Sequence, residues 1–294
     1  MPIESSCATI AVAGAGTMGT GIAIVAARGK AQTIVFDVNA ERAKSAVQDL
    51  KRFFERSVEL GRMSREQAKD TFRRVSSTDR LDALGAADLV IEAVFEDFEV
   101  KAELLAELDK VLRLEAIVAS NTSTLSITRL AAATKWPQRV VGMHFCLPAQ
   151  LMKLVELTPG LRTSVETLAK ADRYCRALGQ IPVVTKDTPG FVLNRFVIPF
   201  NNDAIRLVER GVATPQDIDR AVCKALGHPL GPLQLVDLVG LDTQLRLCEA
   251  FYDITRDPRH VCPPLVRQMV AAGYLGKKCG KGFYDYDSPH TFGA

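Results

Sequence analysis

The chain has 294 residues, of which 47% are hydrophobic and 24% are charged, and its formal net charge is +3. This length exceeds that of a usual single domain, so two domains are expected, and the composition is that of an ordinary globular protein. The small and scattered charge argues against a nucleic-acid partner, and no apolar stretch approaches the roughly 20 residues that a membrane span needs.

Seven cysteines lie far apart in the chain, with no C-x-x-C spacing among them. This pattern fits neither a disulfide framework nor a zinc site, so no metal is expected. Reduced thiols favour a cytoplasmic location. The N-terminal stretch carries Glu4 and lacks the basic region of a signal peptide, which favours the same location.

The first predicted elements are a short buried strand at residues 8–12, the turn GAGTMG and a helical segment. A second apolar run follows, and it ends in Asp37. Strand, G-x-G-x-x-G, helix, strand and acid, in this order, are typical of a dinucleotide-binding unit. The alternative for the hexapeptide alone is a glycine turn that binds no ligand.

Each part of this turn has a physical role in binding a dinucleotide. Gly14 permits the tight turn, Gly16 lets the backbone approach a pyrophosphate, and Gly19 lets the helix pack close to the strand. Asp37 can accept hydrogen bonds from ribose hydroxyls, and no adjacent arginine could hold a 2′-phosphate, so NAD is favoured over NADP. The predicted cofactor residues here are Gly14, Gly16, Thr17, Met18, Gly19 and Asp37.

Residues 40–74 are rich in charge and in helix-forming residues, with an interruption at Gly61. Ser64, with Glu66 and Gln67 close behind, is typical of a new helix start, so the segment predicts two helices. A simple crossover needs only one helix, and the pair is therefore expected to be an insertion that projects from the sheet. The basic residues of the first helix form either a solvated face or a ligand contact: Lys51, Arg52, Arg56 and Arg62.

Strands and helices continue to alternate as far as Asp187, and only helical segments follow from Gly190 onward. The alternation predicts an α/β fold, with an N-terminal Rossmann-type doubly wound sheet that is largely parallel and carries the inserted helical pair. The expected domains are an NAD-binding unit at residues 1–187 and an all-α C-terminal domain at residues 188–294. Apolar residues on several faces of the later helices suggest a subunit interface.

The stretch GMHFCLPAQLMKLVEL places His144 and Glu156 inside apolar runs, where the chain otherwise has Val, Met and Leu. Histidine exchanges protons near neutral pH, and a buried carboxylate beside it can fix the imidazole tautomer and stabilise the imidazolium. His144 is predicted to end a strand, and ligands of open α/β sheets bind at the carboxyl ends of strands. We therefore expect a proton-transfer dyad, and the alternative is a tolerated buried pair.

Over nearly its whole length the chain resembles the L-3-hydroxyacyl-CoA dehydrogenases, including bacterial 3-hydroxybutyryl-CoA dehydrogenases. The motifs that carry the resemblance are GAGTMGTGIA, DLVIEAVFEDFEVK, ASNTSTLSIT, GMHF…MKLVEL, KDTPGFVLNR, GPLQLVDLVGLDT and GKKCGKGFYDY. The resemblance implies an oxidoreductase of fatty acid metabolism that binds NAD and an acyl-coenzyme A substrate. It implies interconversion of (S)-3-hydroxyacyl-CoA and 3-ketoacyl-CoA, and a homodimer formed by the helical domain.

The resemblance also implies roles for single residues. The catalytic residues would be His144 as the base, Glu156 as the acid that orients it, and Ser123 and Asn194 beside the substrate. The remaining implied contacts are Arg56 for the nucleotide end of CoA, and Glu96 and Lys101 for NAD. Taken alone, Ser123 and Asn194 could be helix caps, and Glu96 and Lys101 could be an ordinary surface ion pair.

The sequence departs from the family after His144. Leu147 stands where relatives typically have an asparagine, and Gln150 stands where they usually have a proline. This departure leaves the acyl chain length open, and with it two alternatives. One is a dehydrogenase of a free hydroxy acid or sugar acid, and the other is a nucleotide-binding protein that has lost catalysis.

Overall fold

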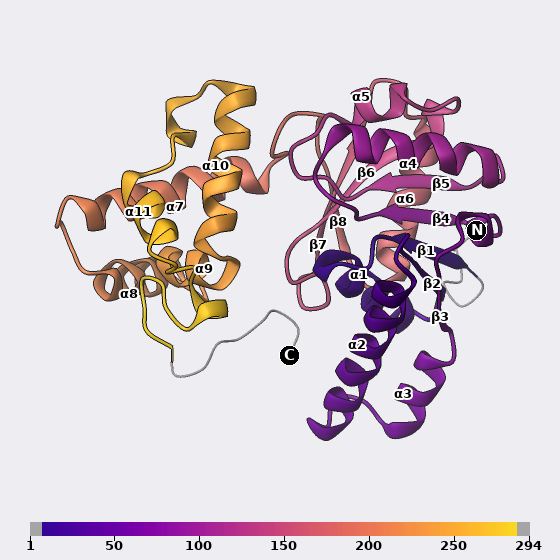
Figure 1. Ribbon diagram of the computed structural model, residues 1–294, viewed down its shortest axis with the longest axis horizontal. Coiled ribbons are helices and arrows are strands. Elements are labelled where there is room, and N and C mark those ends of the chain that lie inside the picture. Colours follow the sequence, from indigo (N-terminus) through magenta and orange to yellow (C-terminus); the bar gives the residue numbers. More distant parts are fainter. Residues whose placement is uncertain (1–7, 287–294) are drawn as a thin grey trace. The chain divides into compact units, whose positions relative to one another are not determined.

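The structure is a computed structural model that describes residues 8–286 of the chain. The chain divides into two compact units: the first ends at Phe191 and the second begins at Val192 (Figure 1). The first unit is built on a sheet and the second is helical, as the sequence predicts. None of the helices within residues 8–286 combines the length and the apolar character that a membrane span requires.

The first unit contains one eight-stranded sheet with the order β3-β2-β1-β4-β5-β6-β7-β8. All neighbouring strands run parallel except β6 and β7, which are antiparallel. This confirms the largely parallel, doubly wound sheet. The strands are β1 Thr9–Ala13, β2 Gln32–Phe36, β3 Val75–Thr78, β4 Leu89–Glu92, β5 Ile117–Ser120, β6 Val140–Phe145, β7 Leu154–Pro159 and β8 Ile181–Val184.

Helices cover the sheet on both faces because each presents an apolar stripe to the strands. The helices of this unit are α1 Thr17–Arg28, α2 Ala40–Glu59, α3 Arg65–Phe72, α4 Phe98–Val111, α5 Ile127–Ala132 and α6 Val165–Ala177. One core cluster includes Ile22 of α1 and Tyr174 of α6. The other includes Leu108 of α4 and Leu130 of α5, so these two pairs of helices cover opposite faces.

The inserted helical pair, α2 and α3, projects from the sheet (Figure 1). Helix α3 begins with a capping box, in which the Ser64 side chain accepts from the Gln67 amide and the Gln67 side chain accepts from the Ser64 amide. The chain then enters β3, an edge strand that the sequence analysis missed. Its sequence, VSST, is half-buried and mostly polar, and so lacks the apolar run that marks the interior strands.

The second unit contains helices α7 Leu193–Glu209, α8 Pro215–Leu226, α9 Pro232–Val239, α10 Leu241–Thr255 and α11 Pro264–Ala271. Its own apolar core includes Ile205, Leu233 and Phe251, which are fully buried. Short 3-10 turns occur in both units, at η2 Leu81–Leu84, η3 Pro137–Arg139, η4 Pro258–His260 and η5 Lys277–Cys279.

Candidate active site

The glycine-rich turn between β1 and α1 has a backbone that only glycine fits at two positions. Gly14 has φ +110°, and a Cβ there would lie 2.5 Å from the carbonyl oxygen of Ala93. A Cβ on Gly19 would lie 1.7 Å from the carbonyl oxygen of Gly14. The turn thus brings α1 against the carboxyl ends of β1 and β4, as a dinucleotide-binding turn requires.

The N-terminus of α1 is suited to an anionic ligand. Its first residue outside the helix is Gly16, so no side chain caps the helix, and its first turn has no acidic residue. A Cβ on Gly16 would meet nothing within 4 Å, which leaves space for a pyrophosphate to approach the helix N-terminus. Asp37 lies at the same turn, where its carboxylate accepts from the backbone amide of Ala15 at 3.0 Å. These features fit NAD.

The register of β6 and β7 brings His144 and Glu156 together. The two residues are direct partners in this antiparallel pair. His144 Nδ1 lies 2.8 Å from Glu156 Oε2, and the residues are 8% and 1% exposed. Because Glu156 is a carboxylate acceptor, it favours the tautomer with the proton on Nδ1, which leaves the lone pair on Nε2. The imidazole is thus arranged as a proton acceptor.

Two residues that the sequence analysis missed contact the His144 segment. The Asn121 side-chain oxygen accepts from the backbone amide of Phe145 at 2.8 Å, and so ties the end of β5 to the residue after His144. The Phe191 ring is buried with its centroid 5.6 Å from that of His144. Phe191 has φ +47°, a costly conformation for an aromatic residue, and no sequence pattern marks such strain.

Cys146 lies two residues after His144, but its thiol is a poor nucleophile. Burial, together with the nearby Glu156 carboxylate, raises the pKa of Cys146 to about 12. The thiol therefore stays protonated at neutral pH, and the thiolate is the form that attacks carbonyl carbon. The site favours proton transfer by His144 over covalent catalysis by Cys146.

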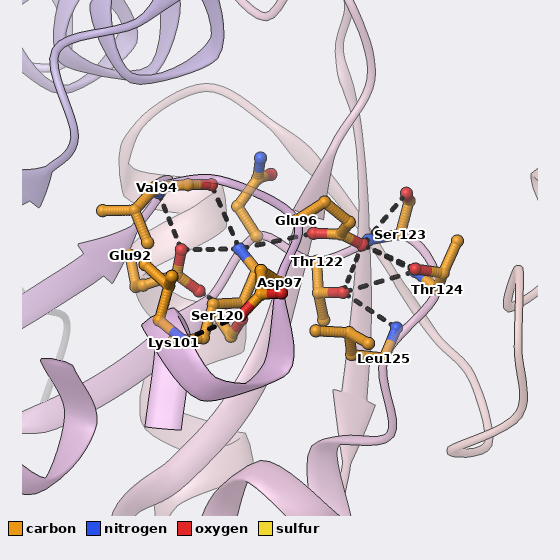
Figure 2. Close-up of polar contacts among 12 residues, drawn as sticks. Glu92, Val94, Glu96, Asp97, Lys101, Ser120, Thr122, Ser123, Thr124 and Leu125 are labelled. Atoms are coloured by element: carbon orange, nitrogen blue, oxygen red, sulfur yellow. Dashed lines mark hydrogen bonds and ion pairs between the residues drawn. The ribbon is translucent and has the colours of Figure 1, made fainter. Parts of the chain in front are cut away.

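Ser123 lies in the segment after β5, and Glu96 holds that segment (Figure 2). Glu96 Oε1 lies 2.9 Å from the backbone nitrogen of Ser123 and 3.0 Å from that of Thr124. The hydroxyls of Thr122 and Thr124 lie at 2.6 and 2.9 Å from the same oxygen. Burial disfavours the charge on Glu96, but Lys101 and these donors outweigh it and lower the pKa of Glu96.

Lys101 is buried, with 1% of its side chain exposed. Its ammonium lies 2.6 Å from Glu92 Oε1 and 3.3 Å from Glu96 Oε2. The alternative of an ordinary surface ion pair for Glu96 and Lys101 is therefore wrong. Glu92 was missed, although it carries the same signal as His144: a titratable residue that ends an apolar run.

The helix-cap alternative is also wrong for both residues that it concerned. Helix α5 is capped by Ser126, whose hydroxyl accepts from the Arg129 amide, so Ser123 lies outside the helix. Asn194 is the second residue of α7, and the N-cap position belongs to Val192. Asn194 thus belongs to the helical unit, whereas Ser123 and His144 belong to the sheet unit.

The remaining predicted residues lie on the inserted pair and on the loop after β6. Arg56 is 66% exposed on α2, where its guanidinium lies 2.7 Å from the Glu59 carboxylate. Leu147 is half-buried and precedes a cis peptide bond to Pro148. Gln150 is buried, and its side-chain oxygen lies 2.7 Å from the position of a Cβ on Gly21 of α1. The Gln150 amide thus packs against α1.

A doubly wound sheet with a glycine turn, an acid after β2 and a buried histidine–carboxylate pair defines a nucleotide-dependent dehydrogenase. Residues 9–188 match the 3-hydroxyacyl-CoA dehydrogenase NAD binding domain, and residues 190–286 match the C-terminal domain of the same enzymes. The chain belongs to the 3-hydroxyacyl-CoA dehydrogenase family, and its cofactor is NAD.

Individual relatives agree with this assignment. The chain is 43% identical to a probable 3-hydroxybutyryl-CoA dehydrogenase of Bacillus subtilis over 95% of this chain and 97% of that protein. The crystal structure of Mycobacterium tuberculosis FadB2 superposes with a TM-score of 0.91 at 41% identity, covering 95% of this chain and 98% of that one. The (S)-3-hydroxybutyryl-CoA dehydrogenase of Ralstonia eutropha gives a TM-score of 0.88 at 38% identity, with 95% and 99% covered.

Proposed function

We propose that this protein interconverts (S)-3-hydroxyacyl-CoA and 3-ketoacyl-CoA, with His144 and Glu156 as its proton-transfer dyad. The observation that carries the proposal is the 2.8 Å contact between His144 Nδ1 and Glu156 Oε2. This contact occurs in a chain whose family dehydrogenates acyl-CoA thioesters. It lies at the carboxyl end of β6, the edge of an α/β sheet at which ligands bind.

In the oxidative direction, His144 Nε2 takes the proton of the substrate's C3 hydroxyl. The glycine turn at Gly14, Gly16 and Gly19 would hold NAD, which would supply the acceptor for the hydride on C3. The Glu156 carboxylate stabilises the imidazolium that forms, and it keeps the ring in one orientation because it is itself buried. In the reductive direction, the same imidazolium returns the proton to the oxygen of the 3-keto group.

Other residues of the chain bind and orient the two ligands. Ser123 and Asn194 position the oxygen functions of the substrate, and Arg56 contacts the nucleotide end of CoA. Glu96 and Lys101 contribute to the NAD site as well as holding the Ser123 segment. Leu147 stands where relatives typically have an asparagine, and this apolar side chain favours an apolar acyl chain.

We further infer a homodimer formed by the helical unit. Large apolar side chains are exposed on this unit: Phe196 is 72% exposed, Val212 63% and Leu226 62%. Burying such residues against a second copy would remove apolar surface from water.

We also place the protein in the cytoplasm, because the six cysteines among residues 8–286 are free thiols.

The test is reduction of acetoacetyl-CoA, followed by the loss of NADH absorbance and extended to 3-ketoacyl-CoAs of increasing chain length. We expect NADH to be consumed with the thioester, and far more slowly with free acetoacetate. Equal turnover of the free acid would favour a hydroxy-acid dehydrogenase. Binding of NADH without consumption, at every chain length, would mean that the protein has lost catalysis.

A further inference from the structure

A second buried carboxylate, Glu92, lies at the carboxyl end of β4, and the proposed reaction assigns it no role. Its side chain has no exposed surface. Oε1 lies 2.6 Å from Lys101 Nζ and accepts from the Val94 amide at 2.8 Å, while Oε2 accepts from the Ser120 hydroxyl at 2.6 Å. Both oxygens of Glu92 are thus held, and each contacts a different element.

A continuous series of ion pairs and hydrogen bonds leads from Glu92 to Ser123 (Figure 2). Lys101 Nζ lies between the two carboxylates, at 2.6 Å from Glu92 and 3.3 Å from Glu96. Glu96 in turn accepts from the backbone amides of Ser123 and Thr124 at 2.9 and 3.0 Å. Glu92 fixes the position of the Lys101 ammonium. This positive charge stabilises the Glu96 carboxylate, which in turn holds the segment that carries Ser123.

The backbone of Glu92 makes a second connection to the site. Its carbonyl oxygen accepts from the amide of Asn121 at 2.8 Å. The Asn121 side chain accepts from the amide of Phe145, the residue after His144. The ends of β4, β5 and β6 are therefore joined at the point where Ser123 and His144 leave the sheet.

Stability alone does not explain this arrangement. A buried ion pair gains little over a well-packed apolar pair, because both charges lose their hydration, whereas leaving one charge unpaired is costly. What an ion pair adds is a defined geometry for the groups that it contacts. Here the contacted groups are Lys101 and Glu96, which connect the interior of the sheet to the half-buried Ser123.

We propose that Glu92 is a positioning residue for catalysis, which acts through Lys101 and Glu96 to hold Ser123 in place for the substrate. This inference rests on the proposed function, because it needs Ser123 to contact the substrate. A displacement of about 1 Å in a positioned group can cost about 100-fold in rate, so the effect of losing Glu92 should appear in kcat.

Helix α4, which carries Lys101, also provides a matched control. Asp109 lies near the C-terminal end of α4 and pairs with Arg139 at 2.7 Å, and the two side chains are 2% and 5% exposed. This pair is buried like Glu92–Lys101, but within residues 8–286 the one further donor to the Asp109 carboxylate is the Lys135 amide. Asp109→Asn therefore removes a comparable buried ion pair without touching the Ser123 segment.

The experiment is a double-mutant cycle with Glu92→Gln and Ser123→Ala, measured as kcat and KM for acetoacetyl-CoA with NADH. Glu92→Gln should lower kcat by about 10- to 100-fold with a smaller change in KM, and should have little further effect once Ser123 is Ala. Asp109→Asn should leave kcat unchanged in both backgrounds.

The outcomes separate this inference from the proposed function. If Ser123→Ala lowers kcat and the loss caused by Glu92→Gln multiplies with it, or if Asp109→Asn lowers kcat equally, the role of Glu92 is overturned and the function stands. If Ser123→Ala keeps full activity, the role of Ser123 fails and the role of Glu92 fails with it. A wild-type protein without activity overturns the function itself.

Hydrogen exchange gives a readout that does not depend on activity. The backbone amides of Ser123 and Thr124 should exchange faster in Glu92→Gln and at the wild-type rate in Asp109→Asn. If Glu92→Gln does not fold, Ser120→Ala removes one donor from Glu92 and leaves both charges in place. It should speed exchange of the same two amides to a smaller extent, and unchanged exchange would overturn the proposal.

Discussion

Buried carboxylates occur in both units, and their partners differ. In the sheet unit, Glu156 contacts the ionisable ring of His144 at 2.8 Å. In the helical unit, Asp237 is equally buried, but its two oxygens accept from the backbone amides of Phe283 and Tyr284, each at 2.9 Å. Glu156 is placed to stabilise the positive charge that the His144 imidazole gains when it takes up a proton. Asp237 fastens the C-terminal segment to α9.

Burial of a charge thus does not by itself mark an active site. Burial raises the pKa of Asp237, and its bonds to backbone amides and to a tyrosine hydroxyl only partly offset that rise. All of these partners keep their protons at neutral pH. A buried carboxylate indicates catalysis when its partner can change protonation state and lies near the ligand-binding edge of the sheet.

Among variants that leave His144 in place, the largest effect is expected for Glu156→Gln. A neutral amide cannot stabilise the imidazolium and can hold the wrong tautomer, so kcat should fall by about 10³–10⁴-fold while the fold is retained. The matched control is Thr158→Val on the same strand, because the buried Thr158 hydroxyl lies 2.6 Å from the Thr185 hydroxyl, outside the His144–Glu156 pair. Equal losses in the two variants would assign the effect to damage of β7 and not to the dyad.

Asp237→Asn should produce the opposite profile. One oxygen becomes an amide donor that faces backbone donors, so the free energy of unfolding should fall by about 1–3 kcal/mol. The folded fraction should keep its kcat, because Asp237 accepts from Phe283, Tyr284 and Tyr286, which all belong to its own helical unit. Denaturant unfolding and kinetics on the folded protein measure the two quantities. A loss of kcat without a loss of stability would break the distinction between the two carboxylates.

The smallest effect is expected for Arg56→Ala. The guanidinium is exposed and already lies near Glu59, so a contact with CoA phosphates should raise KM for the acyl-CoA only a few-fold, about 1 kcal/mol or less. Arg52→Ala on the same helix is the control, since Arg52 is similarly exposed and pairs with Asp49. The change should vanish with an acyl thioester that lacks the nucleotide. Identical KM changes for both variants would remove Arg56 from the CoA site.

Much of the fold follows from the sequence because interior strands and amphipathic helices leave clear patterns. The apolar run of β4 and the capping residues of α3 are of this kind. Strand β3 is not predicted, because an edge strand buries only part of its surface and the sequence VSST therefore resembles a turn. Its pairing with β2 depends on the tertiary fold, which no local pattern encodes.

The candidate site is predictable in part for the same reason. His144 and Glu156 stand out because each interrupts an apolar run, and their contact follows from the register of β6 and β7. Glu92 gives the same signal, but its partner Lys101 comes from a helix, so the contact needs the three-dimensional structure. The positive φ of Phe191 cannot be predicted from its residue type.

His144 is the residue on which the proposed reaction depends, because it accepts the substrate proton. The most direct test is kcat for 3-hydroxybutyryl-CoA oxidation by His144→Ala, with the dissociation constant of NADH measured on the same preparation. If His144 is the base, kcat should fall by about 10²–10⁴-fold while NADH affinity stays nearly unchanged. Wild-type turnover by a folded His144→Ala protein would contradict it.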